Sequence, residues 1–483
     1  RILQTQALAS GGEEQSGRIY SFLVEKSSAP YLDMLEKWIY FGRVEDPYAE
    51  FMVVEKPYLA IHEDTYWEKR FAAREAQVPA FLNDKVVVHK ILTTGKYLTV
   101  IRECGEGGAC PHAKKIAFSH NDRLYAELVD QAYQYASETV LRLLMDKNNL
   151  VDRLESLKHY FLVDQGDWFV HFMDTAYNEL CKDVRGIRKE RLESMLQLSL
   201  VTSIAASDPF KDDVGCDLIN CTALDEVLNV ISIDGLDKQA KVLPYDASSA
   251  DGGPALTGMD AFTLAYRVDW PLNVVLSKAT LTKYRWLFRH LFTYKCVERE
   301  LCSAWMMHQG AKAHGAQYKV FMVDFALRRR MQHFLQSLQH YLVMDVVENS
   351  WHTFREGMRQ VATVDDVLRT HDRFLSTCIK HFMLNDPQLL KQLSRTVATC
   401  EKFVKYSQTK AEAFTPPEIE QRQLGEDGEE RVGGRGNPSQ ARARRRQFEA
   451  AAKVLADDEA YVSTVAKYEA EFDDKITLLL ESL

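Results

Sequence analysis

The stretch "DWPLNVVLSKATLTKYRWLFRHLFTYKCVERELCSAW", residues 269 to 305, decides the fold class. Its large apolar side chains recur every three or four residues, which is the period of one face of an α-helix. The residues that set this period are Leu281, Tyr284, Phe288 and Leu291. The segment 278–305 is therefore expected to form a helix that buries this face.

The same period extends outward along most of the chain. Helices are expected at 176–205, 221–234, 271–312, 317–356, 363–383 and 386–410. Residues 29–100 are also expected to be mainly helical, with a break at "GRVEDPYAE", where Gly42 and Pro47 do not suit a helix interior. Residues 124–163 keep the period for about 40 residues, so they are expected to form two helices or one long helix. Only 86–88 and 262–268 have an extended pattern, so the sequence predicts an all-α fold.

Glycine, proline and polar clusters mark the ends of these helical regions. "RECGEGGACPHAKK", residues 102–115, holds three glycines and a proline, so we expect a domain boundary near 116. Small, polar segments bury too little apolar surface to offset the entropy lost on folding. On this ground we expect a flexible lead-in at 1–17, a loop at 241–258 and a disordered linker at 407–441. Residues 442–483 regain the period and are expected to form a terminal helix that packs back onto the body.

The composition is that of a globular, acidic protein. The chain has 483 residues, 46% of them apolar, which suits two or three domains. Its net charge of −9 argues against general binding of nucleic acid. No apolar run reaches the roughly 18 to 20 residues of a membrane helix, so we expect a soluble chain. The nine scattered cysteines fit a reducing cytosol, and the first residue, Arg1, suggests a piece of a longer polypeptide.

One cluster has the residue types of an acid–base site. "YFLVDQGDWFVHFMD", residues 160–174, holds Asp164, Asp167 and His171, which a hydrolase could use if a pocket separated their pKa values. The alternative, which we favour, is a turn in which Gly166 ends one helix in the left-handed conformation and Asp167 caps the next. In that case the core takes up Phe161, Leu162, Trp168, Phe169 and Phe172.

Signatures of nucleotide, zinc or nucleophile chemistry are absent from the sequence. "TTGK" at 93–96 lacks the first glycine of a phosphate-binding loop, and Lys90 stands in its place. Cys104, Cys110 and His112 could hold zinc, but the gap between the cysteines is too long and no second ligand pair follows, so a plain loop is favoured. We expect no cofactor and no metal.

Basic residues lie on two of the expected helices. Lys278, Arg285 and Arg289 are spaced seven and four apart on a face away from the apolar one, and the run 328–330 is on the next helix. They are either two solvated faces or one patch that suits an acidic protein. A further run, "RARRR" at 442–446, could be a localisation or anionic-surface signal, but we favour solvation of the start of the last helix.

Several blocks, in order along residues 30 to 405, resemble the gamma-tubulin complex protein family. The blocks are "WIYFGRVEDPYAEFMV" (38–53), "TGKYLTVIRECG" (94–105), "KHYFLVDQGDWFVHFMD" (158–174), "DPFKDD" (208–213), the opening stretch (269–305) and "LRRRMQHFLQSLQHYLVMDVVE" (327–348). The resemblance implies an elongated stack of helical bundles. It also implies the end of an N-terminal GRIP region at 1–115, which makes lateral contacts, and a C-terminal GRIP region at 116–483, which binds gamma-tubulin.

The implied function is a non-enzymatic scaffold that templates microtubule nucleation at organising centres and spindle poles in the cytoplasm. The implied partners are gamma-tubulin and other gamma-tubulin complex proteins, with component 3 as the lateral neighbour. Charge and expected exposure within the implied domain select the gamma-tubulin-binding candidates Asp164, Gln165, Gly166, Asp167, Trp168, Lys278, Lys283, Arg285, Arg289, Arg328, Arg329 and Arg330. The lateral-contact candidates are Trp38, Tyr40, Tyr48 and Phe51.

Overall fold

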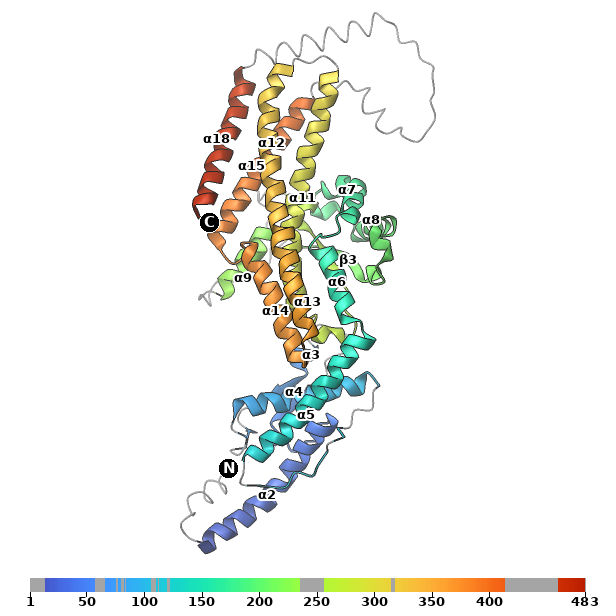
Figure 1. Ribbon diagram of the computed structural model, residues 1–483, viewed down its shortest axis with the longest axis vertical. Helices are drawn as coiled ribbons and strands as arrows, with labels where there is room; N and C mark the ends of the chain where they lie inside the picture. Colours follow the sequence, from blue (N-terminus) through green and yellow to red (C-terminus); the bar gives the residue numbers. More distant parts are fainter. Residues whose placement is uncertain are drawn as a thin grey trace, which may run out of the picture.

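The computed structural model is an elongated stack of helices with the N-terminal body at one end (Figure 1). The described residues are 14–56, 66–74, 77–79, 82, 84–105, 110–111, 113–119, 122–234, 256–313, 318–412 and 459–482. Strands within this part are few and short. The predicted all-α architecture of stacked bundles is confirmed.

Residues 278–305 of the opening stretch lie in the central element of the larger body, α11 (Lys278–Ala313), a helix of 36 residues that begins later than the predicted start at 271. The faces of α11 are covered by α12 (Tyr318–His340), α14 (Val364–His381) and α15 (Pro387–Glu412). A π-helical segment, η8 (Tyr341–Glu348), joins α12 to α13 (Asn349–Arg359). The last helix, α18 (Glu459–Ser482), packs against α15 and α12, so the expected return of the terminal helix to the body is confirmed (Figure 1).

The side chains that set the helical period are in the core. Tyr284, Phe288 and Leu291 are each no more than 1% exposed. Phe288 packs edge-on against Phe161 of α6 (Leu150–Phe161), with 6.1 Å between the ring centroids. Burial of each such aromatic side chain contributes roughly 2 to 3 kcal/mol.

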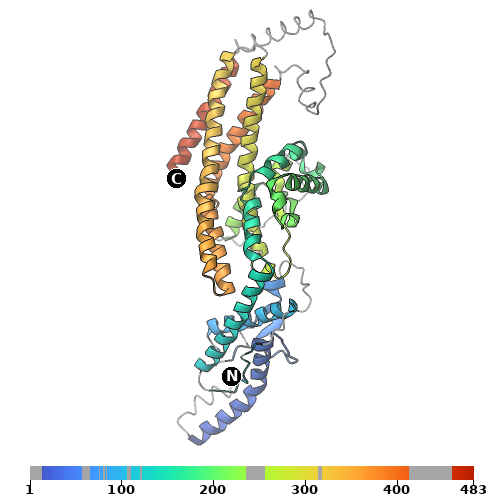
Figure 2. The same cartoon turned by 45° about the vertical axis from the view of Figure 1, so that its right-hand side comes forward.

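A small lobe lies on one side of this bundle, as Figure 2 shows in teal and green. It contains α7 (Asp167–Leu180), α8 (Lys189–Thr202) and two 3₁₀ turns, η5 (Ile204–Ser207) and η6 (Lys211–Asp213). An antiparallel two-stranded sheet of β3 (Val214–Leu218) and β4 (Phe262–Tyr266) joins the lobe to α11. The extended segment expected at 262–268 is thus confirmed for its first five residues.

The N-terminal body has a core of its own. It contains α2 (Glu14–Phe41), α4 (Lys85–Glu103) and α5 (Asp122–Arg142), with a two-stranded sheet of β1 (Val53–Glu55) and β2 (Phe71–Ala73). Trp38 is fully buried and donates a hydrogen bond from Nε1 to the carbonyl of Ile91 at 2.8 Å. A Cβ at Gly95 would lie 2.0 Å from the Trp38 ring, so only glycine permits this close packing of α2 on α4.

Some expected elements differ from the observed ones. Residues 86–88 lie inside α4, because their apolar side chains continue the helical period and three residues cannot decide between strand and helix. The short strands β1 and β2 were missed within a segment expected to be helical. Residues 124–163 form two helices, α5 and α6, separated by the π-helical segment η3 (Leu143–Lys147).

Other predictions fall partly or wholly outside the described residues. The expected lead-in becomes helical from Glu14 and the expected linker is helical as far as Glu412. The remaining parts of the lead-in, of the linker and of the loop at 241–258, together with the basic run at 442–446, lie largely or entirely outside the described part of the chain. No helix of the described residues is long and apolar enough to cross a membrane.

Candidate functional site

The turn between α6 and α7 carries the acidic cluster, but its backbone differs from the prediction. Gly166 is right-handed (φ −76°) and Asp167 is the first residue of α7, so neither the left-handed glycine nor the aspartate cap is observed. The left-handed residue is instead Val163, with φ of +51°. A β-branched residue rarely adopts this conformation, and here the buried Val163 side chain is held in the core.

The same turn is fixed by a buried lysine. Lys158, only 5% exposed, places its Nζ 3.2 Å from Asp164 and 2.5 Å from Glu348 of η8. Nδ1 of His159 lies 3.1 Å from the same Asp164 carboxylate. The hydrogen bond with His159 and the nearby ammonium of Lys158 hold the pKa of Asp164 well below its usual range. Asp164 is therefore a structural ion that ties the turn to the bundle.

The proposed acid–base trio is not assembled. Asp164 is occupied by Lys158 and His159, whereas Asp167 and His171 are exposed on the first turns of α7. The five aromatic and apolar side chains expected in the core are buried there, among them Trp168 at 1% exposure. The capped-turn interpretation was therefore right about packing and wrong about the conformation of Gly166 and the role of Asp167.

Beside this turn lies a surface that the sequence reasoning missed. Val170, Leu198, Val201 and Ile204 are 53%, 56%, 62% and 67% exposed. We call these four residues the α7–α8 apolar face; they lie on α7, α8 and η5, three elements that contact one another. Solvent exposure of several large apolar side chains together is typical of a protein contact site.

The signal for this face was present in the sequence. Residues 194–207, "SMLQLSLVTSIAAS", contain no charged residue. Leu196 and Leu200 point into the core, at 0% and 2% exposure, while Leu198 and Val201 of the same helix remain outside. An amphipathic helix of a monomer would carry charged residues on that outer side.

The basic residues of α11 are largely neutralised within the chain. Arg289 is 2% exposed and donates to the Glu226 carboxylate and to the carbonyl oxygens of Cys221 and Asp260. Arg285 pairs with the same Glu226 at 2.5 Å, and Lys283 pairs with Asp372 at 2.5 Å. The exposure expected for Arg289 is therefore wrong, because α9 (Ala223–Asp234) supplies a partly buried carboxylate opposite it.

The arginine run on α12 is also internally engaged. Arg328 is 9% exposed and donates to Gln332 at 3.0 Å, so its expected exposure is also wrong. Arg330 pairs with Glu469 at 2.9 Å and with Asp473, both on α18, whereas Arg329 is exposed. Gln332, the partner of Arg328, lies beside Cys302 of α11. Cys302 is 17 residues along α11 from Arg285, so the basic residues of α12 lie about 25 Å from Arg285. They do not form one patch.

Only some of the remaining candidate residues are exposed to solvent. Trp38, Tyr40 and Phe51 are at most 3% exposed, so as surface contacts they are wrong, because they build the core of the N-terminal body. Tyr48 is 83% exposed. Gly166, Asp167 and Lys278 are also exposed, and Gln165 is half-buried.

The described residues show no cluster of ligands that could hold a metal ion. Cys110 is buried in the N-terminal core, and its backbone N–H donates to the carbonyl of Tyr40 at 3.1 Å. Cys104 lies at the end of α4, and His112 falls outside the described part.

These features define an elongated, all-helical protein of stacked bundles. The gamma tubulin complex component N-terminal family model matches residues 2–147, and the C-terminal model of the same family matches residues 150–483. The chain belongs to the gamma-tubulin complex component family. The resemblance expected from the sequence blocks is thereby confirmed. The two matched ranges meet at η3 and the residues after it, while the boundary near 116 stays a prediction.

Individual relatives agree with this assignment. The chain is 41% identical to gamma-tubulin complex component 2 of Mus musculus over 409 residues, which are 83% of this chain and 44% of the relative. It is 37% identical to component 2 of Arabidopsis thaliana, over 84% of this chain and 59% of the relative. It is 32% identical to the spindle pole body component alp4 of Schizosaccharomyces pombe, over 82% and 57%. The chain therefore spans about half the length of the curated relatives that it matches.

Proposed function

We propose that this chain is a scaffold subunit of a gamma-tubulin complex that binds gamma-tubulin through its C-terminal helical body. The single observation that carries the proposal is membership of a family whose two models together match residues 2–147 and 150–483. The helical body also has an exposed, uncharged apolar face. This supports the proposal, because covering apolar surface with another protein removes it from water and costs no desolvation of charge.

The scaffold would act by geometry and not by catalysis. Nucleation of a filament is slow because the first contacts must overcome lost translational and rotational freedom. A ring of subunits that holds several copies of gamma-tubulin in place has already met that cost, so later tubulin adds to prepared neighbours. This role fits spindle poles and other microtubule organising centres in the cytoplasm. The lateral neighbours would be other complex components, component 3 among them, with Tyr48 as an accessible contact residue.

Our candidate docking surface for gamma-tubulin is the α7–α8 apolar face together with the rigid turn at 165–167. The turn cannot easily move, because Val163 is held in a rare conformation and Lys158 fixes Asp164. A preorganised surface loses little conformational entropy on binding. The exposed basic residues Lys278 and Arg329 remain secondary candidates, and the 1–115 and 116–483 division of roles remains part of the proposal.

A double variant tests the docking surface. Leu198→Glu with Val201→Glu places two charges in the face, and we expect gamma-tubulin pull-down to fall at least about ten-fold because a desolvated interface does not accept unpaired charge. The matched control is Leu478→Glu with Leu480→Glu on α18, where the two leucines are 55% and 66% exposed. Equal loss in both variants, or no loss in the first, would remove the α7–α8 face from the proposal.

A further inference from the structure

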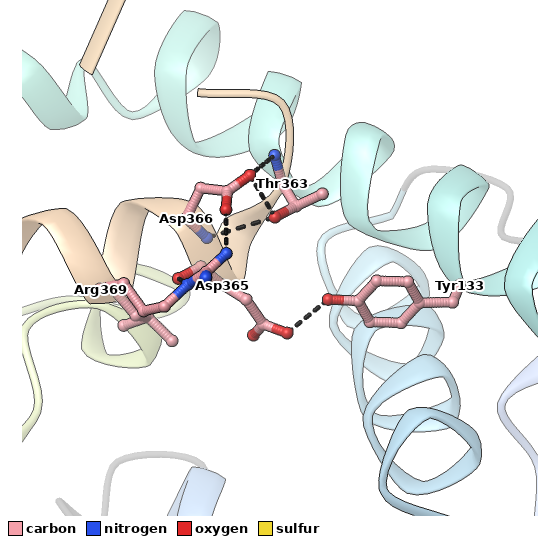
Figure 3. Close-up of a pocket in the computed structure, with 6 residues that line it drawn as sticks. Tyr133, Thr363, Asp365, Asp366 and Arg369 are labelled. Atoms are coloured by element: carbon pink, nitrogen blue, oxygen red, sulfur yellow. Dashed lines mark hydrogen bonds and ion pairs between the residues drawn. The ribbon is translucent and has the colours of Figure 1, made fainter. Parts of the chain in front are cut away.

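The N-terminal body and the long bundle meet at the first turn of α14. Thr363 precedes this helix and forms a capping box with Asp366: the Thr363 hydroxyl accepts from the Asp366 backbone N–H, and the Asp366 carboxylate accepts from the Thr363 backbone N–H at 3.1 Å. The carboxylate of Asp365, one residue earlier, is left to point away from its own helix toward α5 (Figure 3). The cap therefore fixes the direction in which Asp365 is presented.

Asp365 accepts hydrogen bonds from two tyrosines of the other body. The hydroxyl of Tyr97, on α4, lies 2.9 Å from Oδ1, and the hydroxyl of Tyr133, on α5, donates to Oδ2. Tyr97 is 1% exposed. Burial first, and then the charge and hydrogen bond of Asp365, raise the pKa of both tyrosines. Both hydroxyls therefore remain protonated donors at ordinary pH.

A third hydrogen bond joins the same two bodies. The backbone N–H of Val364 donates to Oγ of Ser137 on α5 at 3.0 Å, and both residues are fully buried. This N–H is one of the orphan donors at a helix start, so a side chain of the neighbouring body completes the helix. Charged acceptors make the stronger hydrogen bonds, so Asp365 carries the larger share of the polar attachment.

The covalent connection between the bodies is built differently. The chain leaves α5 through the π-helical segment η3 and passes Asn149, which is left-handed with φ of +46°, before α6 begins. A π-helical segment is a rare interruption of an α-helix, and a left-handed asparagine is typical of a turn. Rotation at residues 143–149 would change the angle between the bodies, with local repacking where α4 and α5 share buried side chains with the bundle.

Space for such a movement is present beside Asp365. An open cleft of about 500 Å³ lies between α5 and the start of α14, lined by Tyr133, Thr363, Asp365, Asp366, Leu368 and Arg369 (Figure 3). Tyr97, Leu98, Ala136 and Val140 of α4 and α5 belong to the same buried cluster as the bundle. Release of the polar contacts would therefore loosen the junction without separating the two bodies.

We propose that Asp365, Tyr97 and Tyr133 form a junction lock that sets the angle between the N-terminal body and the long bundle, with residues 143–149 as the hinge. In the lock, hydroxyls from two helices of the N-terminal body donate to one carboxylate of α14. Two contacts from different directions fix the orientation of α14 relative to that body as well as its distance. When the lock is released, the bodies sample a wider range of angles about the hinge. The inference concerns the chain alone and does not depend on the proposed binding of gamma-tubulin.

Double electron–electron resonance tests the lock on the whole chain. Spin labels carried by unnatural amino acids at Lys85 on α4 and Lys402 on α15, both exposed, report the distance between the bodies. We expect one narrow distance distribution for the parent chain, and roughly twice the width after Asp365→Asn, because an amide is a weaker acceptor for the two hydroxyls. Tyr133→Phe, which removes one hydroxyl and retains the ring, should give an intermediate width.

The control variant is Asp366→Asn, which weakens the capping box of the same helix but touches neither tyrosine. It should lower the melting temperature and leave the distance distribution unchanged. If Asp365→Asn and Tyr133→Phe fold with the parent circular dichroism spectrum and keep the parent distribution, the lock is refuted. If Asp366→Asn broadens the distribution as much as Asp365→Asn, the junction depends on the helix start and not on the lock, which also refutes the proposal.

Discussion

The α7–α8 apolar face and the basic residues of α11 and α12 differ in how far their side chains are free to contact another protein. The basic residues looked available in the sequence, yet Arg289, Arg285 and Arg330 all have carboxylate partners within the chain. The four residues of the apolar face were not among the sequence candidates, yet their side chains are at least 53% exposed. A charge in the sequence is therefore no evidence of a free charge, and an apolar residue with no partner in its own chain points to a partner outside it.

The largest expected effect tests whether the arginines of α11 are truly internal. Glu226→Ala removes the carboxylate that faces the buried Arg289, so we expect the free energy of unfolding to fall by about 3 to 5 kcal/mol, measured by urea denaturation. The control is Glu469→Ala, which breaks the half-exposed pair with Arg330 and should cost less than about 1 kcal/mol. A small effect of Glu226→Ala would mean that the carbonyl oxygens of Cys221 and Asp260 are sufficient partners for Arg289, which would contradict the role we assign to the internal carboxylate.

A second pair of variants compares the two sides of α8. Leu200, 2% exposed, faces the core, so Leu200→Ala should lower the free energy of unfolding by about 2 to 4 kcal/mol. Leu198, 56% exposed on the same helix, should cost less than about 0.5 kcal/mol when changed to alanine. If the two costs measured by thermal unfolding were equal, Leu198 would be part of the core and the apolar face would not exist as a free surface.

A third, smaller effect concerns Glu300 on α11. The arginines of this helix are paired with carboxylates, whereas Glu300 is raised in pKa by its surroundings. Burial first, and then the nearby Glu401, raise the pKa of Glu300 to about 7 against the opposing charge of Lys405. The folded state therefore favours the protonated form. The contribution of Glu300 to the free energy of unfolding is fully present below pH 4.5. It is lost as pH rises toward 7, and the loss amounts to as much as about 3 kcal/mol.

Glu300→Gln should remove this dependence. Urea denaturation between pH 5 and pH 8 should give a flatter stability profile for the variant than for the parent chain, with the gain largest at pH 8. Glu127→Gln on α5, an exposed position, serves as the control and should follow the parent profile. An unchanged slope in Glu300→Gln would show that Glu300 is ionised in the folded chain.

The sequence predicted the helices because the helical period directly reflects burial. Tyr284 and Phe288 show this on α11, as do the buried aromatic residues around Gly166. Prediction from the sequence failed where tertiary packing overrides the local preference of a residue. Val163 adopts the left-handed conformation that glycine was expected to take, since the core holds its side chain and Lys158 fixes the following Asp164. No local signal contains that information.

The candidate site was less predictable than the fold. Amphipathic spacing shows that Arg285 and Arg289 share a face, but not that Glu226, some 60 residues earlier in the chain, is opposite them. In the same way, Trp38 has the residue type of a contact aromatic, yet Gly95 creates a slot that buries it. The uncharged run at 194–207 was the one readable signal of the exposed face, and it required the structure to separate Leu198 from Leu200.

Size-exclusion chromatography of this chain with purified gamma-tubulin, at 0.1 M and at 0.5 M salt, tests the central claim most directly. The account predicts a complex at both salt concentrations, because an uncharged apolar contact is little screened by ions whereas contacts between exposed charges are. Absence of a complex at either concentration, or a complex that forms only at 0.1 M salt, would contradict it.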